Sequence, residues 1–172
     1  AYSLDIYEFD LIMPNDVEDE FILLWGDDYH PINYSSLVEL HRRYSSLLTM
    51  TVTEKHESMN LRHENGKVID YNKSTPPANF NGYEAGTSVV DKKVVEEYGK
   101  NGKWSWEETV YPALSGQIIA HIDNTKFWDM GTPKRLEKLD KNNNFTFFNS
   151  NLSQKNSLNE IKKYDISSIY HM

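Results

Sequence analysis

Acidic side chains follow two apolar segments of the sequence, where the ends of strands are expected. Asp27 and Asp28 come directly after the apolar run Phe21–Trp25 and a glycine, and Asp129 follows an aromatic pair. Open α/β sheets bind their ligands at the carboxyl ends of strands. Two carboxylates that meet there would suit Mg²⁺, which takes one or two carboxylates together with substrate phosphates. The alternative is that these aspartates only form turns and caps, and their spacing leaves both interpretations open.

Other residue types narrow the chemistry that this chain could carry. There are no cysteines, so thiolate metal sites and cysteine nucleophiles are excluded. No serine stands in a G-x-S-x-G elbow, and no histidine pair has a metal-ligand spacing, although His30 follows closely on the acidic turn. The glycines are too scattered to form a loop that cradles a phosphate. Lys73, which follows a predicted strand, is either a solvated lysine or a phosphate anchor.

The composition excludes several classes of function. The chain has 172 residues, 38% of them hydrophobic, which is the composition of a folded domain rather than of a disordered segment. Its 26 acidic residues outnumber 18 Lys and Arg, and the formal net charge of −8 disfavours binding to nucleic acid. The longest apolar run is far too short to span a bilayer, and no signal peptide is visible. We therefore expect a cytoplasmic protein that binds neither nucleic acid nor a membrane.

The elements that would position these side chains alternate between strand and helix. Phe21–Trp25 has the continuous apolar pattern of a strand buried on both faces. Ser36–Glu39 matches a capping box that begins a helix, and the β-branched residues 48–53 indicate another strand. The first strand, this helix and the second strand together have the size of a βαβ unit. Asn65-Gly66 is typical of a hairpin turn.

The second half of the sequence continues this pattern. Strands are expected at 87–90 and 117–122, and Asp91 caps the helix that follows the first of them. Ser105–Glu108 is another capping box, and Thr132 caps a last helix that begins at a proline. After residue 141 the sequence becomes rich in Asn and Ser. We predict a mixed α/β domain over residues 1–141, followed by a polar linker and tail over 142–172.

A series of segments in collinear order resembles the sugar-phosphate nucleotidyltransferase family. They are residues 21–27, 37–43, 49–53, 66–73, 83–90, 104–114 and 127–136. The fourth matches a G-x-V-x-x-x-x-K strand, the sixth an S-x-E-x-x-x-x-P-x-L helix, and the last the signature [WFY]-x-D-x-G-T-P-x-x-L. Each match alone is weak, but their order is specific. With G-D-x-Y-x-P-I at residues 26–32, the chain is most similar to the branch of heptose- or mannose-1-phosphate guanylyltransferases and cytidylyltransferases.

This resemblance implies a fold and a reaction. The fold would be α/β, Rossmann-like and three-layered, with a mixed, mostly parallel sheet. In the reaction, a sugar 1-phosphate attacks the α-phosphorus of a nucleoside triphosphate and expels pyrophosphate. Asp27 and Asp129 would hold Mg²⁺, and Lys73 would hold the phosphate of the sugar. The other implied substrate-binding positions are Tyr29, Asn72, Glu84, Gly86 and Trp128, of which Glu84 would bond sugar hydroxyls and Gly86 would let the sugar approach closely.

The sequence departs from the family at its beginning and at two substrate positions. The glycine-rich G-G-x-G-T-R-L loop that binds the nucleoside triphosphate is absent, as is the lysine after it. Asn72 stands where the family has Glu, and Glu84 where it has Asn, so the sugar is left open. We expect this chain to be inactive by itself, with a second chain or a missing N-terminal half completing the enzyme. Missing strands would also expose a sheet edge, which favours a homo-oligomer.

Two other functions remain open. A metal-dependent glycosyltransferase of the GT-A type also combines a nucleotide-binding α/β fold with acidic metal turns, but it needs an Asp-x-Asp where this chain has Asp27-Asp28-Tyr29. A non-catalytic binding or assembly subunit would keep the fold without the nucleotide loop. The sequence favours the sugar- and metal-binding part of a sugar-1-phosphate nucleotidyltransferase.

Overall fold

The chain forms two compact units in a computed structural model that describes residues 14–99 and 104–140; the tail predicted over 142–172 lies outside the described residues. Of the described residues, those from Pro14 to Trp25 and from His30 to Phe127 belong to the first unit, and Gly26–Tyr29 and those from Trp128 to Asp140 belong to the second. No helix within the described ranges is long and apolar enough to cross a membrane. In chain order the described elements are η2 (Pro14–Asp16), β1 (Glu20–Leu24), β2 (Asp28–Tyr29), α1 (Tyr34–Tyr44), β3 (Leu48–Thr53), β4 (Leu61–Glu64), β5 (Lys67–Tyr71), β6 (Tyr83–Asp91), α2 (Lys92–Tyr98), α3 (Trp106–Ala113), β7 (Ile119–Ile122), β8 (Trp128–Asp129) and α4 (Pro133–Asp140).

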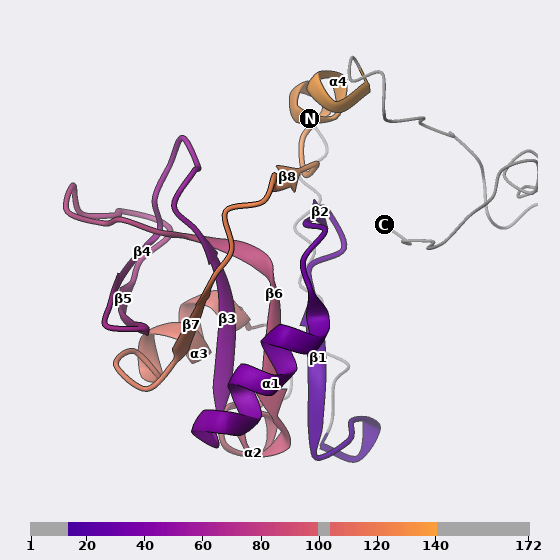
Figure 1. The fold of residues 1–172 in the computed structure, drawn as a ribbon, viewed down its shortest axis with the longest axis vertical. Helices are drawn as coiled ribbons and strands as arrows, with labels where there is room; N and C mark the ends of the chain where they lie inside the picture. The colour runs from indigo at the N-terminus through magenta and orange to yellow at the C-terminus, as the bar shows by residue number, and fades with distance from the viewer. Residues whose placement is uncertain (1–13, 100–103, 141–172) are drawn as a thin grey trace, which may run out of the picture. The chain divides into compact units, whose positions relative to one another are not determined.

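The main sheet belongs to the first unit, and its described strands have the order β1-β6-β3-β7-β5-β4 (Figure 1). β3 runs parallel to β7, whereas all other neighbours in this order are antiparallel. The sheet is therefore mixed, as predicted, but the expectation that it is mostly parallel is wrong for the described strands. The reason lies in the connections, because a hairpin joins β4 to β5 and β6 inserts, in the opposite direction, between β1 and β3. The predicted βαβ unit is present with β6 between its two strands.

Helices cover both faces of this sheet. Successive residues of a strand point to opposite faces. On β6, Val89 packs with Leu37 of α1, whereas Val90 belongs to a larger cluster with Val94 of α2 and Val110 of α3. Figure 1 shows α1 in front of the strands and α2 and α3 behind them. The first unit thus has the three layers that the resemblance implies.

β1 forms one edge of the main sheet and is less buried than its sequence predicts. Among the described strands, it pairs only with β6. Leu23 is buried, but Ile22 and Leu24 leave 41% and 47% of their surface exposed. The prediction of a strand buried on both faces is therefore wrong, because such burial requires helices or strands on every side. β1 is thus an edge strand among the described strands, and the expectation that missing strands expose this edge stays a prediction.

Short side-chain signals begin the helices, and most of them lie where the sequence predicts. Asp91 Oδ1 accepts from the backbone N–H of Lys93 at the start of α2. Ser105 Oγ accepts from the N–H of Glu108 at the start of α3. α1 begins earlier than predicted, because its cap is Asn33 and not Ser36. The side chain of Asn33 accepts from the backbone N–H of Ser36.

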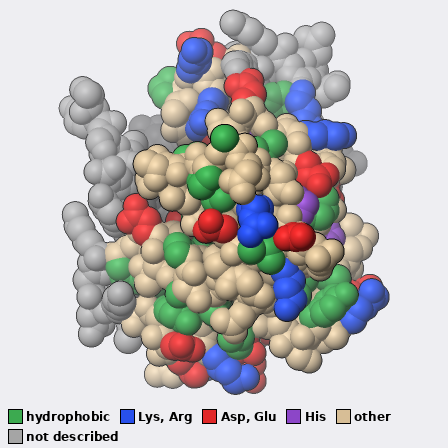
Figure 2. Space-filling model, turned by 90° about the vertical axis from the view of Figure 1, so that its left-hand side faces the viewer, with side chains coloured by type: hydrophobic (Ala, Val, Ile, Leu, Met, Phe, Trp, Pro, Cys, Tyr) green, Lys and Arg blue, Asp and Glu red, His purple; other side chains and the backbone are tan. Residues whose placement is uncertain are grey.

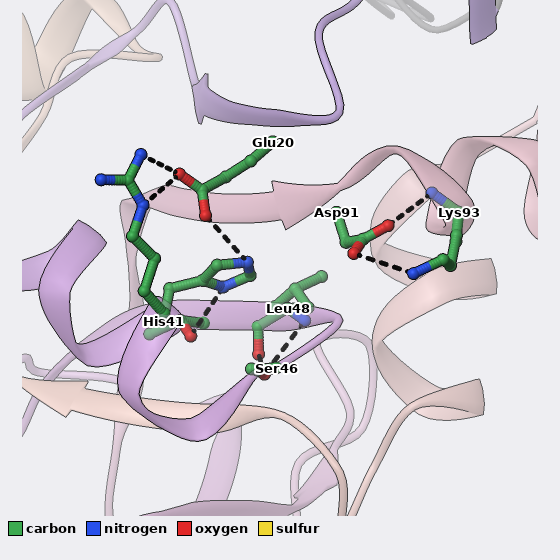
Figure 3. Close-up of polar contacts among 8 residues, drawn as sticks. Glu20, His41, Ser46, Leu48, Asp91 and Lys93 are labelled. Carbon is green, nitrogen blue, oxygen red and sulfur yellow. Dashed lines mark hydrogen bonds and ion pairs between the residues drawn. The ribbon is translucent and has the colours of Figure 1, made fainter.

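A polar network around the buried side chain of His41 ties α1 to β1 and β3 (Figure 3). His41 Nδ1 lies 3.0 Å from Thr49 Oγ1 on β3, and its Nε2 lies 3.9 Å from Glu20 Oε2 on β1. Arg42 Nη2 contacts the other carboxylate oxygen of Glu20 at 2.7 Å. Burial lowers the pKa of His41, against the opposing charge of Glu20, so the ring joins this network as a neutral group. The network anchors the edge strand to the helix.

Charged side chains of both signs are interspersed on the face of the molecule drawn in Figure 2. The net charge of −8 is thus not expressed there as one continuous acidic patch. Elsewhere on the described surface, opposite charges also pair locally, as Arg62 does with Glu64 on β4.

Candidate functional site

β2 and β8 bring the two predicted metal ligands together in the second unit. The strands are antiparallel, with Asp28 opposite Asp129. The backbone N–H of Met130 donates to the carbonyl oxygen of Asp27 at 2.8 Å. These backbone bonds hold Asp27 and Asp129 beside each other on neighbouring chain segments.

The backbone at Gly131 fits closely against both carboxylates. Its N–H donates to Asp129 Oδ1 at 3.0 Å. A Cβ at residue 131 would overlap Asp27 Oδ2 and would lie 3.3 Å from Asp129 Oδ1. Oxygens of both aspartates therefore converge beside this glycine, and no larger residue fits there without moving a carboxylate.

Arg135, in the first turn of α4, adds a positive charge to this acidic pair. Its Nη1 forms an ion pair with Asp129 Oδ2. The turn is held by Thr132, whose Oγ1 accepts from the Arg135 N–H at 3.3 Å, so the predicted cap of this helix is present. The two oxygens of Asp129 are thus engaged differently, one with a guanidinium and the other with a backbone N–H.

The acidic pair fits a cation that needs few protein ligands. No group of three or more His, Asp or Glu side chains able to hold a metal occurs within residues 14–99 and 104–140. A structural zinc or calcium site built only from protein ligands would need more donors than the acidic pair offers. Mg²⁺ accepts one or two carboxylates and fills its other positions with water and phosphate oxygens. The donor set of Asp27 and Asp129 fits Mg²⁺ on this ground.

In the first unit, Lys73 is held by a carboxylate that the sequence analysis did not select. Its Nζ donates to both oxygens of Glu107, at 2.8 Å each. Tyr71 OH donates to Glu107 Oε1 at 3.0 Å. Lys73 follows the end of β5 and Glu107 lies in the first turn of α3, so this cluster links the sheet to the helix.

Glu84, on β6, is a buried carboxyl with defined donors. Its Oε1 accepts from Trp25 Nε1 at 3.2 Å and from the N–H of Gly86 at 2.9 Å. Burial and the nearby charge of Glu107 raise the pKa of Glu84 to about 8, and the ammonium of Lys73 and these two donors lower it in part. At neutral pH most of this side chain is therefore a neutral carboxylic acid.

Gly86 lies two residues further along β6, in a conformation that favours glycine. Its φ is +74°, in the region that L side chains rarely adopt. Its carbonyl oxygen accepts from the backbone N–H of Trp25 at 2.9 Å. The N–H of Gly86 is thus held by Glu84 and its carbonyl oxygen by Trp25.

The other predicted substrate positions have local structural partners. Asn72 Oδ1 accepts from the N–H of Thr75 at 2.9 Å, which closes the turn that carries Lys73. Tyr29 and Trp128 are opposite each other on β2 and β8, and both are partly buried. These contacts show how each side chain is positioned.

The predicted residues thus form two groups, one in each unit. Asp27, Tyr29, Trp128 and Asp129 lie on β2 and β8, and Asn72, Lys73, Glu84 and Gly86 lie on or beside β5 and β6. Sequence reasoning missed Glu107 and Arg135, although both stand inside the family-like segments 104–114 and 127–136. A carboxylate beside a lysine cannot be read from sequence when the two lie on separate elements.

His30, which follows the acidic turn in the sequence, belongs to the first unit and is buried there. Its Nε2 lies 3.1 Å from Thr125 Oγ1 and 3.5 Å from Asp123 Oδ1. Burial lowers the pKa of His30, with Asp123 opposing this shift. These contacts are those of a buried structural histidine.

Comparisons with known proteins place the fold. No protein-family model and no curated protein sequence matches this chain. Among solved structures, HddC from Yersinia pseudotuberculosis in complex with GMP-PN has a TM-score of 0.57 and 22% identity, over 70% of this chain and 54% of that chain. A second HddC structure gives a TM-score of 0.55 and 23% identity over the same shares. The chain has a sugar-phosphate nucleotidyltransferase-like fold.

A third solved structure supports the same fold at lower identity. It is a Bacillus anthracis protein in complex with sucrose, assigned as a glucose-1-phosphate thymidylyltransferase, with a TM-score of 0.59 and 16% identity over 75% of this chain and 57% of that chain. This nucleotidyltransferase-like chain therefore spans a little over half the length of the structures that it matches. The predicted α/β, Rossmann-like fold class is confirmed.

Proposed function

We propose that this chain is the sugar- and metal-binding part of a sugar-1-phosphate nucleotidyltransferase. In the reaction, a phosphate oxygen of the sugar 1-phosphate forms a bond to the α-phosphorus of a nucleoside triphosphate, and the bond from that phosphorus to pyrophosphate breaks. The observation that carries the proposal is the convergence of Asp27 and Asp129 beside Gly131. The nucleotidyltransferase-like fold supports it independently.

Asp27 and Asp129 would hold Mg²⁺, which when bound would neutralise charge on the triphosphate. Arg135 and the N–H of Gly131 each hold one oxygen of Asp129 and so fix the orientation of its carboxylate before a ligand arrives. Groups that are oriented in advance need little reorganisation when charge develops. Tyr29 and Trp128, on the same pair of strands, would offer aromatic surface to the substrates.

Lys73 would bind the phosphate of the sugar, because an ammonium forms strong, charge-assisted hydrogen bonds with phosphate. Glu84 would contact sugar hydroxyls, and as a neutral acid it can both donate and accept a hydrogen bond. Gly86 would let the sugar approach the backbone closely. Asn72 would act on the same substrate through the turn that carries Lys73.

The nucleoside triphosphate would need a second component. The phosphates of such a ligand are commonly held by backbone N–H groups of a glycine-rich loop, and the scattered glycines of this chain cannot form one. We propose that another polypeptide segment, in the same protein or in a partner, supplies this loop. The 172 residues alone should then release no pyrophosphate above background.

Separate titrations of the purified chain test the proposal. We expect mannose 1-phosphate and Mn²⁺, a paramagnetic substitute for Mg²⁺, each to bind, and a nucleoside triphosphate to bind more weakly than it does after a glycine-rich segment is added. That addition should also start pyrophosphate release. Tight binding of a nucleoside diphosphate sugar without binding of a sugar 1-phosphate would favour a glycosyltransferase. Binding of none of these ligands would favour a non-catalytic subunit.

A further inference from the structure

Glu107 of α3 holds the side chain of Lys73 with its carboxylate. Both of its oxygens accept from Lys73 Nζ at 2.8 Å. The lysine side chain is 55% exposed, whereas the Glu107 side chain is only 19% exposed. A largely exposed, flexible side chain is therefore held at one place by a largely buried partner.

Glu107 is itself fixed by its surroundings. Tyr71 OH donates to Oε1, and the Tyr71 ring is buried in the core, in edge-on contact with Tyr111. Glu107 also lies in the first turn of α3, where the unpaired N–H groups of a helix favour a negative charge. The carboxylate thus belongs to the rigid part of the molecule, while Lys73 belongs to the loop after β5.

We propose that Glu107 is a positioning residue that presets the ammonium of Lys73 for a phosphate group. This inference rests on the proposed function, in which Lys73 binds the phosphate of the sugar. Lysine carries a compact charge on a long, mobile stem, and much of its rotamer freedom must be given up for it to act at a fixed point. The bidentate contact with Glu107 removes that freedom before substrate binds, which is the physical basis of preorganisation.

The position of Glu84 adds to this argument. Glu84 is buried on β6, and its carboxyl group responds to the charges of both Lys73 and Glu107. The Lys73 ammonium, held by Glu107, therefore lies within electrostatic range of the strand that carries the proposed sugar-binding residues. If Lys73 moved away from Glu107, the distance from its ammonium to β6 would change. The Lys73–Glu107 contact therefore couples the proposed position of the phosphate to that of the sugar.

Nitrogen-detected NMR of the lysine ammonium groups in the whole chain tests the positioning directly. We expect the order parameter of Lys73 Nζ to fall to less than half its value in Glu107→Gln and to fall less in Tyr71→Phe. Glu108→Gln is the matched control, because it removes an exposed carboxylate one residue away on the same helix. An unchanged order parameter in folded Glu107→Gln would overturn the inference.

A functional measurement uses the enzyme completed by a glycine-rich segment. Glu107→Gln should lower kcat at least tenfold and leave KM for the nucleoside triphosphate within twofold. The double variant Lys73→Ala/Glu107→Gln should be no slower than Lys73→Ala, because Glu107 acts through the lysine. Effects that multiply, or a Glu107→Gln variant that binds inorganic phosphate more tightly at unchanged kcat, would show that Glu107 does not position Lys73.

The two proposals fail in different ways. If mannose 1-phosphate does not shift the Lys73 Nζ resonance although Glu107→Gln lowers its order parameter, the proposed function fails and the positioning contact stands. If mannose 1-phosphate shifts that resonance equally in the unmodified chain and in Glu107→Gln, and the order parameter is the same in both, the sugar-phosphate site stands and the positioning role fails.

Discussion

The two groups of candidate residues place carboxyl groups in opposite environments. Asp27 is exposed, on a ladder of only two residue pairs between β2 and β8. Glu84 is 4% exposed and lies within the main sheet. Contact with water favours the charged form of a carboxyl group, which can bind a cation, whereas burial favours the neutral acid. The same functional group is thus suited to metal binding in one unit and to hydrogen bonding with a neutral ligand in the other.

The supporting contacts differ in the same way. The acidic pair is organised by short-range contacts with Gly131 and Arg135, a few residues beyond Asp129. The Lys73 cluster is organised by contacts between separate elements, from β5 and the loop after it to α3. Glu84 on β6 is likewise held by Trp25, which follows β1. A local site can be altered with little effect on stability, while the buried cluster contributes to the fold itself. This difference can be tested by substitution.

The largest expected effect is on metal binding at the acidic pair. Asp129→Asn should weaken Mn²⁺ binding by at least about 100-fold, because even residues that only support metal ligands cost about 10–100-fold when they are lost. In the enzyme completed by a glycine-rich segment, pyrophosphate release should fall to background. The free energy of unfolding should change little, since β2 and β8 form only two residue pairs.

Asp28→Asn provides the matched control, because Asp28 is the neighbour of Asp27 and pairs with Asp129 across the ladder. Its Mn²⁺ affinity should stay within a few-fold of that of the unmodified chain. Equal losses in Asp28→Asn and Asp129→Asn would mean that general negative charge, rather than a defined site, attracts the ion.

The sequence suffices for those parts of the fold and site that depend on local signals. Asp91, Ser105 and Thr132 each cap a helix as predicted, because a cap needs only a short polar side chain and the amides that follow it. Asn65-Gly66 forms the predicted turn, with both residues at positive φ. Asp27 and Asp129 were both expected beside strand ends, but the short strands β2 and β8 that bring them together were not predicted.

Features set by the three-dimensional arrangement were not predictable in this way. The insertion of β6 between β1 and β3 makes most strand pairs antiparallel, and no periodicity within a strand records which neighbour it will have. The exposure of Ile22 and Leu24 depends on the edge position of β1 rather than on its residues. The contact of Glu107 with Lys73 depends on how α3 packs against β5.

The second effect concerns the buried carboxyl group and is measured as stability against pH. Glu84 has a pKa of about 8 in the folded protein, raised from 4.5 by burial and the charge of Glu107. Between these values the folded protein binds more protons than the unfolded chain, so the free energy of unfolding falls as pH rises and levels off above about pH 8. Glu84→Gln stays neutral at every pH, so its free energy of unfolding should not show this fall. The total fall that the substitution removes is on the order of a few kcal/mol.

Urea unfolding of the unmodified chain and of Glu84→Gln, from about pH 5 to about pH 8.5, measures the difference. Glu39→Gln, on the exposed side of α1, is the matched control and should retain the slope of the unmodified chain. Parallel pH profiles for Glu84→Gln and the unmodified chain would mean that Glu84 is already ionised in the folded protein, and the contrast between the two units would then disappear.

The smallest expected effect comes from one added methyl group at the acidic pair. In Gly131→Ala the new Cβ would overlap Asp27 Oδ2, which is the end of an exposed side chain and can rotate away. The cost in unfolding free energy should therefore stay below the roughly 1–3 kcal/mol that overpacking causes in a core. Mn²⁺ affinity should fall about tenfold, equivalent to about 1.4 kcal/mol, because Asp27 no longer converges with Asp129.

The comparison with Asp27→Asn shows whether the methyl group acts through that carboxylate. Gly131→Ala should weaken Mn²⁺ binding in the unmodified chain and have no further effect in the Asp27→Asn background, because the displaced oxygen has then already lost its charge. Independent effects at residues in direct contact would be unexpected. Losses that simply add would mean that the methyl group acts at Asp129, whose Oδ1 accepts the Gly131 N–H, and not through Asp27.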